Sequence, residues 1–175
     1  MQRILDIIFS GIAILILSPL LAPLAFILRF SGEGEIFYMQ TRIGRHGNSF
    51  GLLKFATMLK NSPNIGSGEI TVKDDPRVLP IGKFLRKSKL NELPQLLNIF
   101  LGHMSVVGPR PMVPNTYKKY PKNAQEILNK VRPGLTGIGS IIFRDEEKLL
   151  DGLEDPIQFY DLNITPYKSQ LEIWY

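Results

Sequence analysis

Asn91 and Glu92 open the segment whose side chains are best suited to phosphate chemistry. The run Asn91–Leu101 predicts a helix, because Asn91 is a favourable N-cap and Pro94 is tolerated in a first turn. A helix N-terminus offers free backbone N–H groups and a positive dipole end, which together bind phosphate. Glu92 beside such a phosphate is a natural oxygen ligand for a magnesium ion that bridges a diphosphate. The segment therefore predicts a phosphate site with a magnesium ligand at Glu92.

Arg110 is the second candidate, because prolines flank it on both sides in the stiff loop Gly108–Pro111. Arginine binds phosphate oxygens through two parallel N–H groups, and the prolines hold it in place at low entropic cost. A purely structural Pro-Arg-Pro loop is the alternative. Arg144 and the acidic residues 145–147 form either a second polar cluster or a solvated helix start. We favour the solvated helix start for the three acids and binding for Arg144.

The N-terminal segment indicates how these groups reach their substrate. No charged side chain occurs from Ile7 to Leu28, and Arg3 and Arg29 stand at the two ends. This length matches the hydrocarbon core of a bilayer. Ser18 and Pro19 fall near the middle, where proline removes a backbone donor and forces a kink or break. A cleaved signal peptide and a buried core helix both fit this run less well.

The charge pattern suggests that this helix returns to the side from which it enters. Arg and Lys tend to stay on the cytoplasmic side, so Arg3 and Arg29 at opposite ends disfavour simple crossing. A helix that bends at Ser18-Pro19 and is re-entrant satisfies both observations, and the Ser18 hydroxyl could bond a carbonyl freed at the kink. An ordinary kinked spanning helix is the alternative that the segment alone leaves open.

Composition places the remainder, residues 31–175, in one cytoplasmic domain after the membrane segment 1–30. Cysteine is absent, which is consistent with a reducing cytoplasm. The net charge of +5 reflects basic runs such as Lys83–Lys89. Beside a membrane, such a run attracts anionic headgroups with about 1 kcal/mol per basic residue. A solvated helix face is the alternative, and no aromatic-basic platform or zinc finger supports nucleic acid as a partner.

The pattern of the domain predicts an α+β fold that is mostly helical and carries a β-hairpin. Strand-forming segments at 35–42 and 50–57 flank a turn at 44–48. Leu93, Leu96, Leu97 and Phe100 recur at helical spacing and should face the core, with Gly102 as the C-cap of their helix. We further expect a short basic helix at 81–89, an amphipathic helix at 117–131, and loops at 108–111 and 132–137.

Several motifs in the same order resemble the bacterial monotopic phosphoglycosyl transferases, also called bacterial sugar transferases. The resemblance covers nearly the whole chain. It is carried by Ser18-Pro19, Arg42-Ile43-Gly44, Lys54-Phe55 before Thr57-Met58, Asp75-Pro76-Arg77, Asn91-Glu92-Leu93-Pro94-Gln95-Leu96, Val107-Gly108-Pro109-Arg110-Pro111 and Arg132-Pro133-Gly134-Leu135-Thr136-Gly137.

This resemblance implies an enzyme that moves a sugar phosphate from a nucleotide-activated sugar, such as a UDP-sugar, onto a polyprenol phosphate. The product is a polyprenyl-diphospho-sugar that initiates glycoconjugate synthesis, for example of an exopolysaccharide. The family implies a re-entrant helix, a place on the cytoplasmic face of the bacterial inner membrane, contact with membrane lipid, and Mg²⁺ dependence. It also implies a covalent phosphosugar intermediate on an aspartate, and it is compatible with a homo-oligomer. The sugar and the pathway stay open.

The sequence departs from the family at that aspartate. The family has an Asp-Glu pair where this chain has Asn91-Glu92, and an amide is not a useful nucleophile toward phosphorus. His103 replaces an aspartate between Gly102 and Met104, and Ala56 replaces a basic residue. The three changes together indicate a natural subgroup.

Two functional classes follow from these departures. In the first, the chain is an active transferase, in which Glu92 or less readily His103 takes the covalent role, or direct displacement occurs. In the second, it is a catalytically silent membrane protein that binds polyprenol phosphate or nucleotide sugar. Both classes use the retained basic residues for phosphate binding: Lys54, Arg77, Arg86, Arg110 and Arg144.

Overall fold

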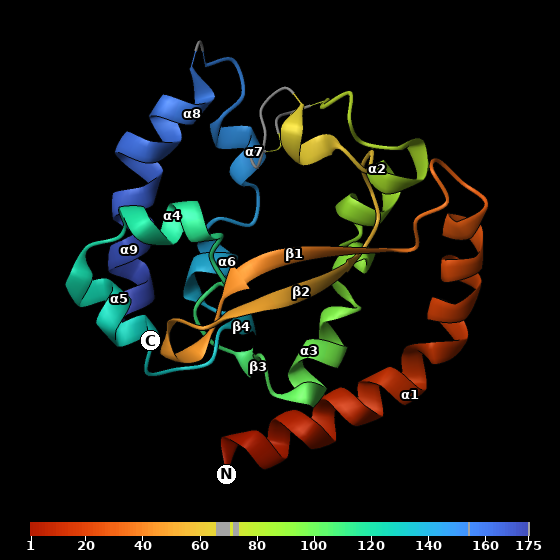
Figure 1. Ribbon diagram of the computed structural model, residues 1–175, viewed down its shortest axis with the longest axis horizontal. Coiled ribbons are helices and arrows are strands. Elements are labelled where there is room, and N and C mark those ends of the chain that lie inside the picture. Colours follow the sequence, from red (N-terminus) through yellow and green to blue (C-terminus); the bar gives the residue numbers. More distant parts are fainter. Residues whose placement is uncertain (66–70, 72–73, 154, 175) are drawn as a thin grey trace. The chain divides into compact units, whose positions relative to one another are not determined.

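The computed structural model describes residues 1–65, 71, 74–153 and 155–174 as helices joined to two small sheets (Figure 1). Helices combined with small sheets agree with the predicted α+β class. The chain forms two compact units: unit 1 contains Met1–Gln40 and Leu52–Phe100, and unit 2 contains Thr41–Gly51 and Leu101–Tyr175. The N-terminal helix belongs to unit 1, and the predicted boundary at residue 30 between a membrane segment and a domain stays a prediction.

Helix α1 (Gln2–Arg29) is long and apolar enough to cross a membrane, and only 6% of its most apolar window is buried. Low burial distinguishes it from the core helix of a soluble protein. Figure 1 shows α1 as two limbs that meet at an angle. The Pro19 nitrogen cannot donate to the carbonyl of Leu15, and the Ser18 hydroxyl donates to that same oxygen at 2.9 Å. The predicted bond from Ser18 to a freed carbonyl is therefore confirmed.

The second limb of α1 packs into the hydrophobic core of unit 1. Its core contains Leu24, Leu28, Phe55 and Leu85, with five partly buried hydrophobic residues around them. Phe55 ends β2 (Ser49–Phe55), which pairs with β1 (Phe37–Ile43) in the predicted hairpin. Leu85 comes from α2 (Pro80–Lys87), which matches the basic helix predicted at 81–89.

The segment that carries Asn91 differs from the prediction. A 3₁₀ turn at Leu90–Glu92 follows Lys89, whose φ of 60° is left-handed, and α3 (Gln95–Leu101) begins three residues after Glu92. Asn91 is therefore not an N-cap, and its side chain is buried. Pro94 has no N–H and cannot donate a helical hydrogen bond, so the regular helix begins only after it, although Leu93 itself has helical dihedrals, with φ of −57° and ψ of −34°. Gly102 follows α3 with a φ of 92°, as predicted for its C-cap.

Unit 2 holds the remaining elements, and its helices are shorter than the sequence predicts. The expected helix at 117–131 is two helices, α4 (Pro114–Lys119) and α5 (Lys122–Leu128). Pro121 separates them, since the preceding Tyr120 is extended with ψ of 145°. The rest of the unit contains α6 (Ile138–Ile142), α7 (Glu146–Leu149), α8 (Pro156–Phe159), a π-helical turn at Tyr160–Ile164, and α9 (Thr165–Ile173).

A small parallel sheet in unit 2 takes one strand from inside the loop predicted at 132–137 and the other from the residues just before the loop predicted at 108–111. Strand β3 (Ser105–Val107) lies parallel to β4 (Gly134–Thr136), and the pairing continues from Gly108 N to Thr136 O at 2.9 Å. Glycines permit this approach: a Cβ on Gly134 would lie 2.1 Å from the nitrogen of Gly108, and one on Gly137 would lie 2.1 Å from the oxygen of Gly108. Three-residue strands carry too little periodicity to predict from sequence.

We expect Gly134→Ala to lower the free energy of unfolding by about 3 kcal/mol, at the upper end of the range for overpacking. The added methyl group would collide with rigid backbone at Gly108, which cannot rotate away. Thermal unfolding in detergent measures the change. Gly152→Ala is the control, because Gly152 has a φ of 74° but a Cβ added there would meet no neighbour within 4 Å, so only backbone strain should remain. Equal losses in both variants would contradict the steric explanation.

Candidate active site

Glu92 and Lys54 form the polar centre of unit 1. The Lys54 ammonium lies 3.9 Å from a carboxylate oxygen of Glu92, and the two side chains are 17% and 23% exposed. Asn98 of α3 accepts a hydrogen bond from the backbone of Leu53 at 2.9 Å, which ties α3 to β2 beside Lys54. The strand and the turn thus present a cation and a carboxylate together, both reachable from solvent.

Asn91 lies next to this pair with an unsatisfied group. The residue is 6% exposed, and its Oδ1 has no hydrogen-bond partner among the described residues. An unpaired buried acceptor costs about 1–3 kcal/mol and is uncommon in folded proteins. Such a group is expected where a ligand completes the hydrogen bonding.

Arg77 is buried and binds the protein's own oxygens. Its Nε and Nη2 donate to the two carboxylate oxygens of Asp75 at 2.8 and 2.5 Å, and Nη1 donates to the carbonyls of Ser62 and Ile65, both at 2.8 Å. The hydrogen bonds to Asp75 raise the pKa of Arg77 further above its usual value. This geometry favours a structural role in holding the segment after β2. Phosphate binding by Arg77 stays a prediction.

Arg86 lies in the last turn of α2, where its Nη1 is 3.7 Å from the sulfur of Met58. Helix α2 sits directly on the chain before Met58, since a Cβ on Gly82 would lie 2.1 Å from the carbonyl oxygen of Thr57. Ala56 is buried, and its nitrogen donates to the carbonyl of Ile36 at 2.9 Å. Arg86 is half-buried, and phosphate binding by its side chain stays a prediction.

Arg110 is held by its backbone, and its guanidinium acts on the buried Glu172 through its charge. Its N–H donates to the Glu172 carboxylate at 3.2 Å, and the neighbouring Pro109 carbonyl accepts from Gly134 at 2.8 Å. On the other side, Arg42 donates to the carbonyl of Pro111 at 2.9 Å. No hydrogen bond or ion pair of the guanidinium is found among the described residues. This arrangement suits an arginine kept for a phosphate ligand.

A buried charged cluster from the C-terminal helix supports that loop. Lys168 pairs with Glu146 and bonds the Tyr160 hydroxyl at 2.9 Å, while Glu172 reaches Arg110. Burial lowers the pKa of Lys168, against the opposing charge of Glu146, and burial raises the pKa of Glu172. Burial also raises the pKa of Tyr160. The sequence prediction missed this cluster, although Lys168 and Glu172 lie four residues apart on one helix face.

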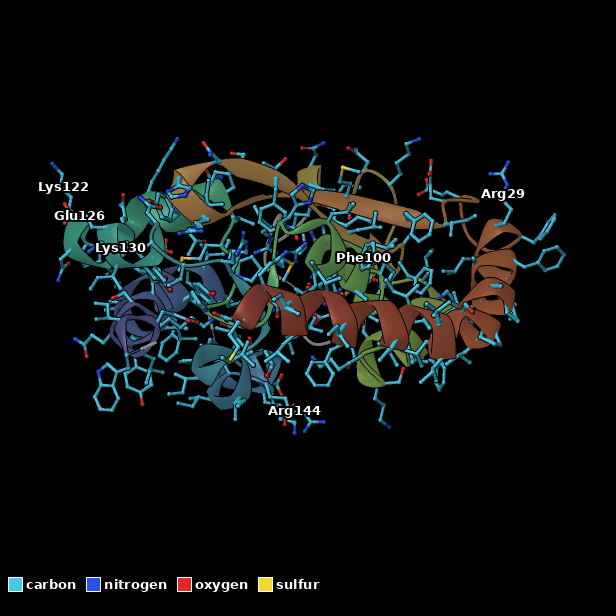
Figure 2. The ribbon with its side chains drawn as sticks, turned by 90° about the horizontal axis from the view of Figure 1, so that it is seen from below. Arg29, Phe100, Lys122, Glu126, Lys130 and Arg144 are labelled. Atoms are coloured by element: carbon cyan, nitrogen blue, oxygen red, sulfur yellow. The ribbon has the colours of Figure 1, made fainter. Side chains whose placement is uncertain are left out.

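The two remaining candidates are both exposed in unit 2. His103 stacks on Phe50, with ring centroids 6.0 Å apart. Arg144 points outward between α6 and α7 (Figure 2). Asp145 pairs with Lys148 at 2.9 Å on the surface, as predicted for a solvated helix start, whereas the prediction is wrong for Glu146, which pairs with the buried Lys168. Unit 1 thus brings together Lys54, Asn91 and Glu92, and unit 2 carries His103, Arg110 and Arg144.

The oxygen donors for a cation are few. Among the described residues no group of three His, Cys, Asp or Glu side chains is placed to hold a metal. Glu92 and the unpaired Asn91 oxygen are adjacent donors at one turn. Magnesium commonly takes one or two carboxylates and completes its shell with phosphate and water. The pair fits an ion that arrives with a diphosphate substrate.

Comparison with known proteins identifies the class to which this fold and site belong. Residues 1–174 match the family model of the bacterial sugar transferases, so the chain belongs to this family. It is 39% identical to the exopolysaccharide production protein ExoY of Sinorhizobium fredii over 159 residues, which covers 83% of this chain and 70% of that protein. The resemblance inferred from the motifs is confirmed.

Two longer relatives carry names that state a reaction. The chain is 36% identical to UDP-glucose:undecaprenyl-phosphate glucose-1-phosphate transferase of Klebsiella pneumoniae over 177 residues, covering 98% of this chain and 37% of that protein. It is 34% identical to undecaprenyl-phosphate galactose phosphotransferase of Salmonella typhimurium over 160 residues, covering 83% and 33%. The chain therefore spans about a third of the length of these relatives.

Proposed function

We propose that this protein transfers a sugar phosphate from a UDP-sugar to undecaprenyl phosphate or a related polyprenol phosphate. The product is a polyprenyl-diphospho-sugar, the first membrane intermediate in the synthesis of a glycoconjugate such as an exopolysaccharide. The names of the relatives in Klebsiella and Salmonella support both substrates, and the family supports a transferase. The comparisons give no support to a catalytically silent member.

The observation that carries this proposal is the turn at Leu90–Glu92. The turn carries a solvent-reachable carboxylate at Glu92 beside the Lys54 ammonium of β2, and a buried Asn91 oxygen that has no partner among the described residues. A diphosphate is a polyanion, so the Lys54 ammonium supplies charge where its oxygens would lie. A buried acceptor without a partner is best explained by a ligand group that donates to it or by a cation.

Glu92 is the group that we assign to the covalent step. One carboxylate oxygen attacks the phosphorus that carries the sugar, the bond from that phosphorus to the bridging oxygen breaks, and UMP leaves with that oxygen. An oxygen of the polyprenol phosphate then attacks the same phosphorus, and the Glu92 carboxylate is released unchanged. Direct attack by the polyprenol phosphate gives the same products without this intermediate. Arg110 and Arg144 are proposed to bind phosphate in either route.

Magnesium is proposed as the cofactor, held by Glu92 together with the substrate phosphates. When bound, it would neutralise charge that develops on the diphosphate. Asn91 provides a neutral oxygen beside that position and orients the neighbouring groups.

Both limbs of α1 pack against other elements of unit 1, which supports the re-entrant arrangement. The first limb contacts α3, where the Arg3 guanidinium bonds to the last carbonyls, and the second limb contributes Leu24 and Leu28 to the core. Between them, Leu15 and Ile16 are 75% and 70% exposed. A helix whose two ends pack against the same unit and whose centre is exposed suits insertion into a single leaflet of the bilayer. We place the protein on the cytoplasmic face of the bacterial inner membrane.

The direct test of the reaction is UMP release from UDP-glucose or UDP-galactose in vesicles that contain undecaprenyl phosphate and magnesium. Release that requires undecaprenyl phosphate supports the proposal. Binding of these substrates without release would revive the silent alternative, and the absence of both binding and release would overturn the proposed function.

We expect the double variant Ser18→Ala, Pro19→Leu to convert α1 toward a spanning helix. Without proline, Leu15 regains a backbone donor at position 19, and the reason for the bend is removed. Labelling of an N-terminal cysteine tag from the periplasmic side of intact cells measures the topology. The wild type should stay unlabelled, and the variant should be labelled. An unchanged topology would show that this pair does not turn the helix.

We expect Arg110→Ala to weaken binding of the nucleotide sugar or the polyprenol phosphate by about 1.5–3 kcal/mol, the range for a lost charged hydrogen bond. Its guanidinium makes no hydrogen bond or ion pair among the described residues and acts on the buried Glu172 only through its charge, so folding should change little. Calorimetry with UDP-glucose, alongside thermal unfolding, separates the two effects. Arg45→Ala is the matched control, because within the described part of the chain the Arg45 side chain donates only to the carbonyl of Lys130 on an exposed turn. A misfolded Arg110→Ala protein would favour the structural role.

A further inference from the structure

We propose that Arg3 is a positioning residue that fixes the Asn91–Glu92 turn relative to the membrane, acting through α3. This inference rests on the proposed function. The Arg3 guanidinium donates to the carbonyls of Ile99 and Phe100 at 2.5 and 2.7 Å. The last carbonyls of a helix have no donor of their own, and a cation at that end also suits the helix dipole. A residue of the membrane helix therefore caps the helix that follows the candidate active site.

Other residues on the same side of the first limb of α1 are also buried. Asp6 and Ser10 are 3% and 1% exposed, although the limb around them is bare. A Cβ on Gly11 would lie 3.5 Å from the ring of Phe100, so the helix backbone approaches that side chain closely. Arg3, Asp6 and Ser10 recur at helical spacing and share one side of α1. Both figures show the end of α3, with Phe100 labelled in Figure 2, beside the first limb.

A shift at this end of α3 reaches the candidate active site because the intervening chain is short and bonded. Leu96 and Leu97 donate to the carbonyls of Leu93 and Pro94, both at 3.0 Å, so helical turns continue from α3 back toward Glu92. Asn98 fixes the same helix to β2. The turn is thus held from the strand on one side and from the membrane helix on the other.

The chemistry explains why the second attachment matters. The polyprenol phosphate keeps its phosphate at the lipid surface, and a carboxylate that attacks a phosphorus must stand at a set height above that surface. Small errors in the placement of reacting groups are costly, and about 1 Å can cost a hundredfold in rate. Arg3 links the depth of α1 in the bilayer to the position of Glu92.

Arg29 offers a matched comparison on the same helix. It is exposed at the other end of α1, and its guanidinium donates to the nearby carbonyl of Gly34 at 3.0 Å (Figure 2). If the two arginines only kept the helix ends on one side of the membrane, their removal would have similar effects. Positioning predicts that Arg3 alone affects the reaction.

The test compares Arg3→Gln, Arg29→Gln and the exchange of Gln2→Arg with Arg3→Gln in the full chain. The exchange keeps the charge at the start of α1 but moves it about 100° around the helix. With UDP-glucose and undecaprenyl phosphate in vesicles, we expect kcat to fall about tenfold to a hundredfold in both variants that lack Arg3. KM for UDP-glucose and membrane insertion should stay within about twofold of the wild type. Full kcat in the exchange variant would overturn the inference.

A second measurement does not depend on turnover. The chain has no cysteine, so Phe9→Cys on α1 and Leu97→Cys on α3 introduce its only two thiols. Both positions are exposed, and spin labels therefore attach at these two sites alone. Electron paramagnetic resonance should give a narrow distance distribution in the wild type and in Arg29→Gln, and a broad one without Arg3. An unchanged distribution without Arg3 overturns the inference even if the transfer reaction is confirmed. A silent wild type whose distribution still broadens without Arg3 would overturn the proposed function alone.

Discussion

Glu92→Gln should abolish turnover of UDP-sugar, by on the order of a thousandfold or more, while Asn91→Asp should keep or raise it. Glu92 is the only carboxylate of the Asn91–Glu92 pair, and its oxygens are accessible beside Lys54. Replacement by the amide keeps the size and removes the nucleophile and the cation ligand. Asn91→Asp restores the acidic pair of the family at a position whose oxygen has no partner among the described residues. UMP release in vesicles measures both variants.

Controls separate this assignment from its competitors. Glu126→Gln changes an exposed carboxylate on α5 (Figure 2) and should leave turnover unchanged. Turnover that survives Glu92→Gln but is lost in His103→Ala would move the covalent role to His103. Turnover that survives both changes would favour direct displacement by the polyprenol phosphate. A silent wild type in which Asn91→Asp creates activity would establish the binding-only class for this chain.

Features set by neighbouring residues could be predicted from the sequence. Proline at position 19 frees one carbonyl, and the hydroxyl that replaces the lost donor is the adjacent residue, Ser18. The hairpin and α2 were predicted for the same reason, because turn residues and amphipathic spacing are local. The family also followed from short motifs in order, and the match over residues 1–174 confirms it.

Features set by distant partners could not be predicted in this way. The parallel pairing of β3 with β4 depends on three glycines from two motifs that each look like a loop. Glu172 is buried because it holds the Arg110 loop from 62 residues away. The sequence indicates the charge of Arg3, but its hydrogen bonds to the carbonyls at the end of α3 are seen only in the folded structure. The presence of a basic residue in a motif does not reveal to which oxygen its side chain donates a hydrogen bond.

Arg77→Ala should lower the free energy of unfolding by about 3–5 kcal/mol, the range for breaking a buried ion pair. Arg77 and Asp75 are 4% and 3% exposed, and removal of the guanidinium leaves the Asp75 carboxylate buried without its bidentate partner. The carbonyls of Ser62 and Ile65 lose their donor as well. Denaturant unfolding in detergent measures the loss.

The double variant Arg77→Met, Asp75→Leu decides what the pair does, because it removes both charges and keeps the volume. If the pair is structural, the double variant should recover most of the stability lost in Arg77→Ala, since no charge is left buried. It should also bind UDP-glucose as the wild type does, in contrast to Arg110→Ala. A stable double variant that no longer binds UDP-glucose would instead return Arg77 to the phosphate-binding role predicted from its motif. The same guanidinium cannot serve both roles fully, because its bonds to Asp75, Ser62 and Ile65 already occupy Nε, Nη1 and Nη2.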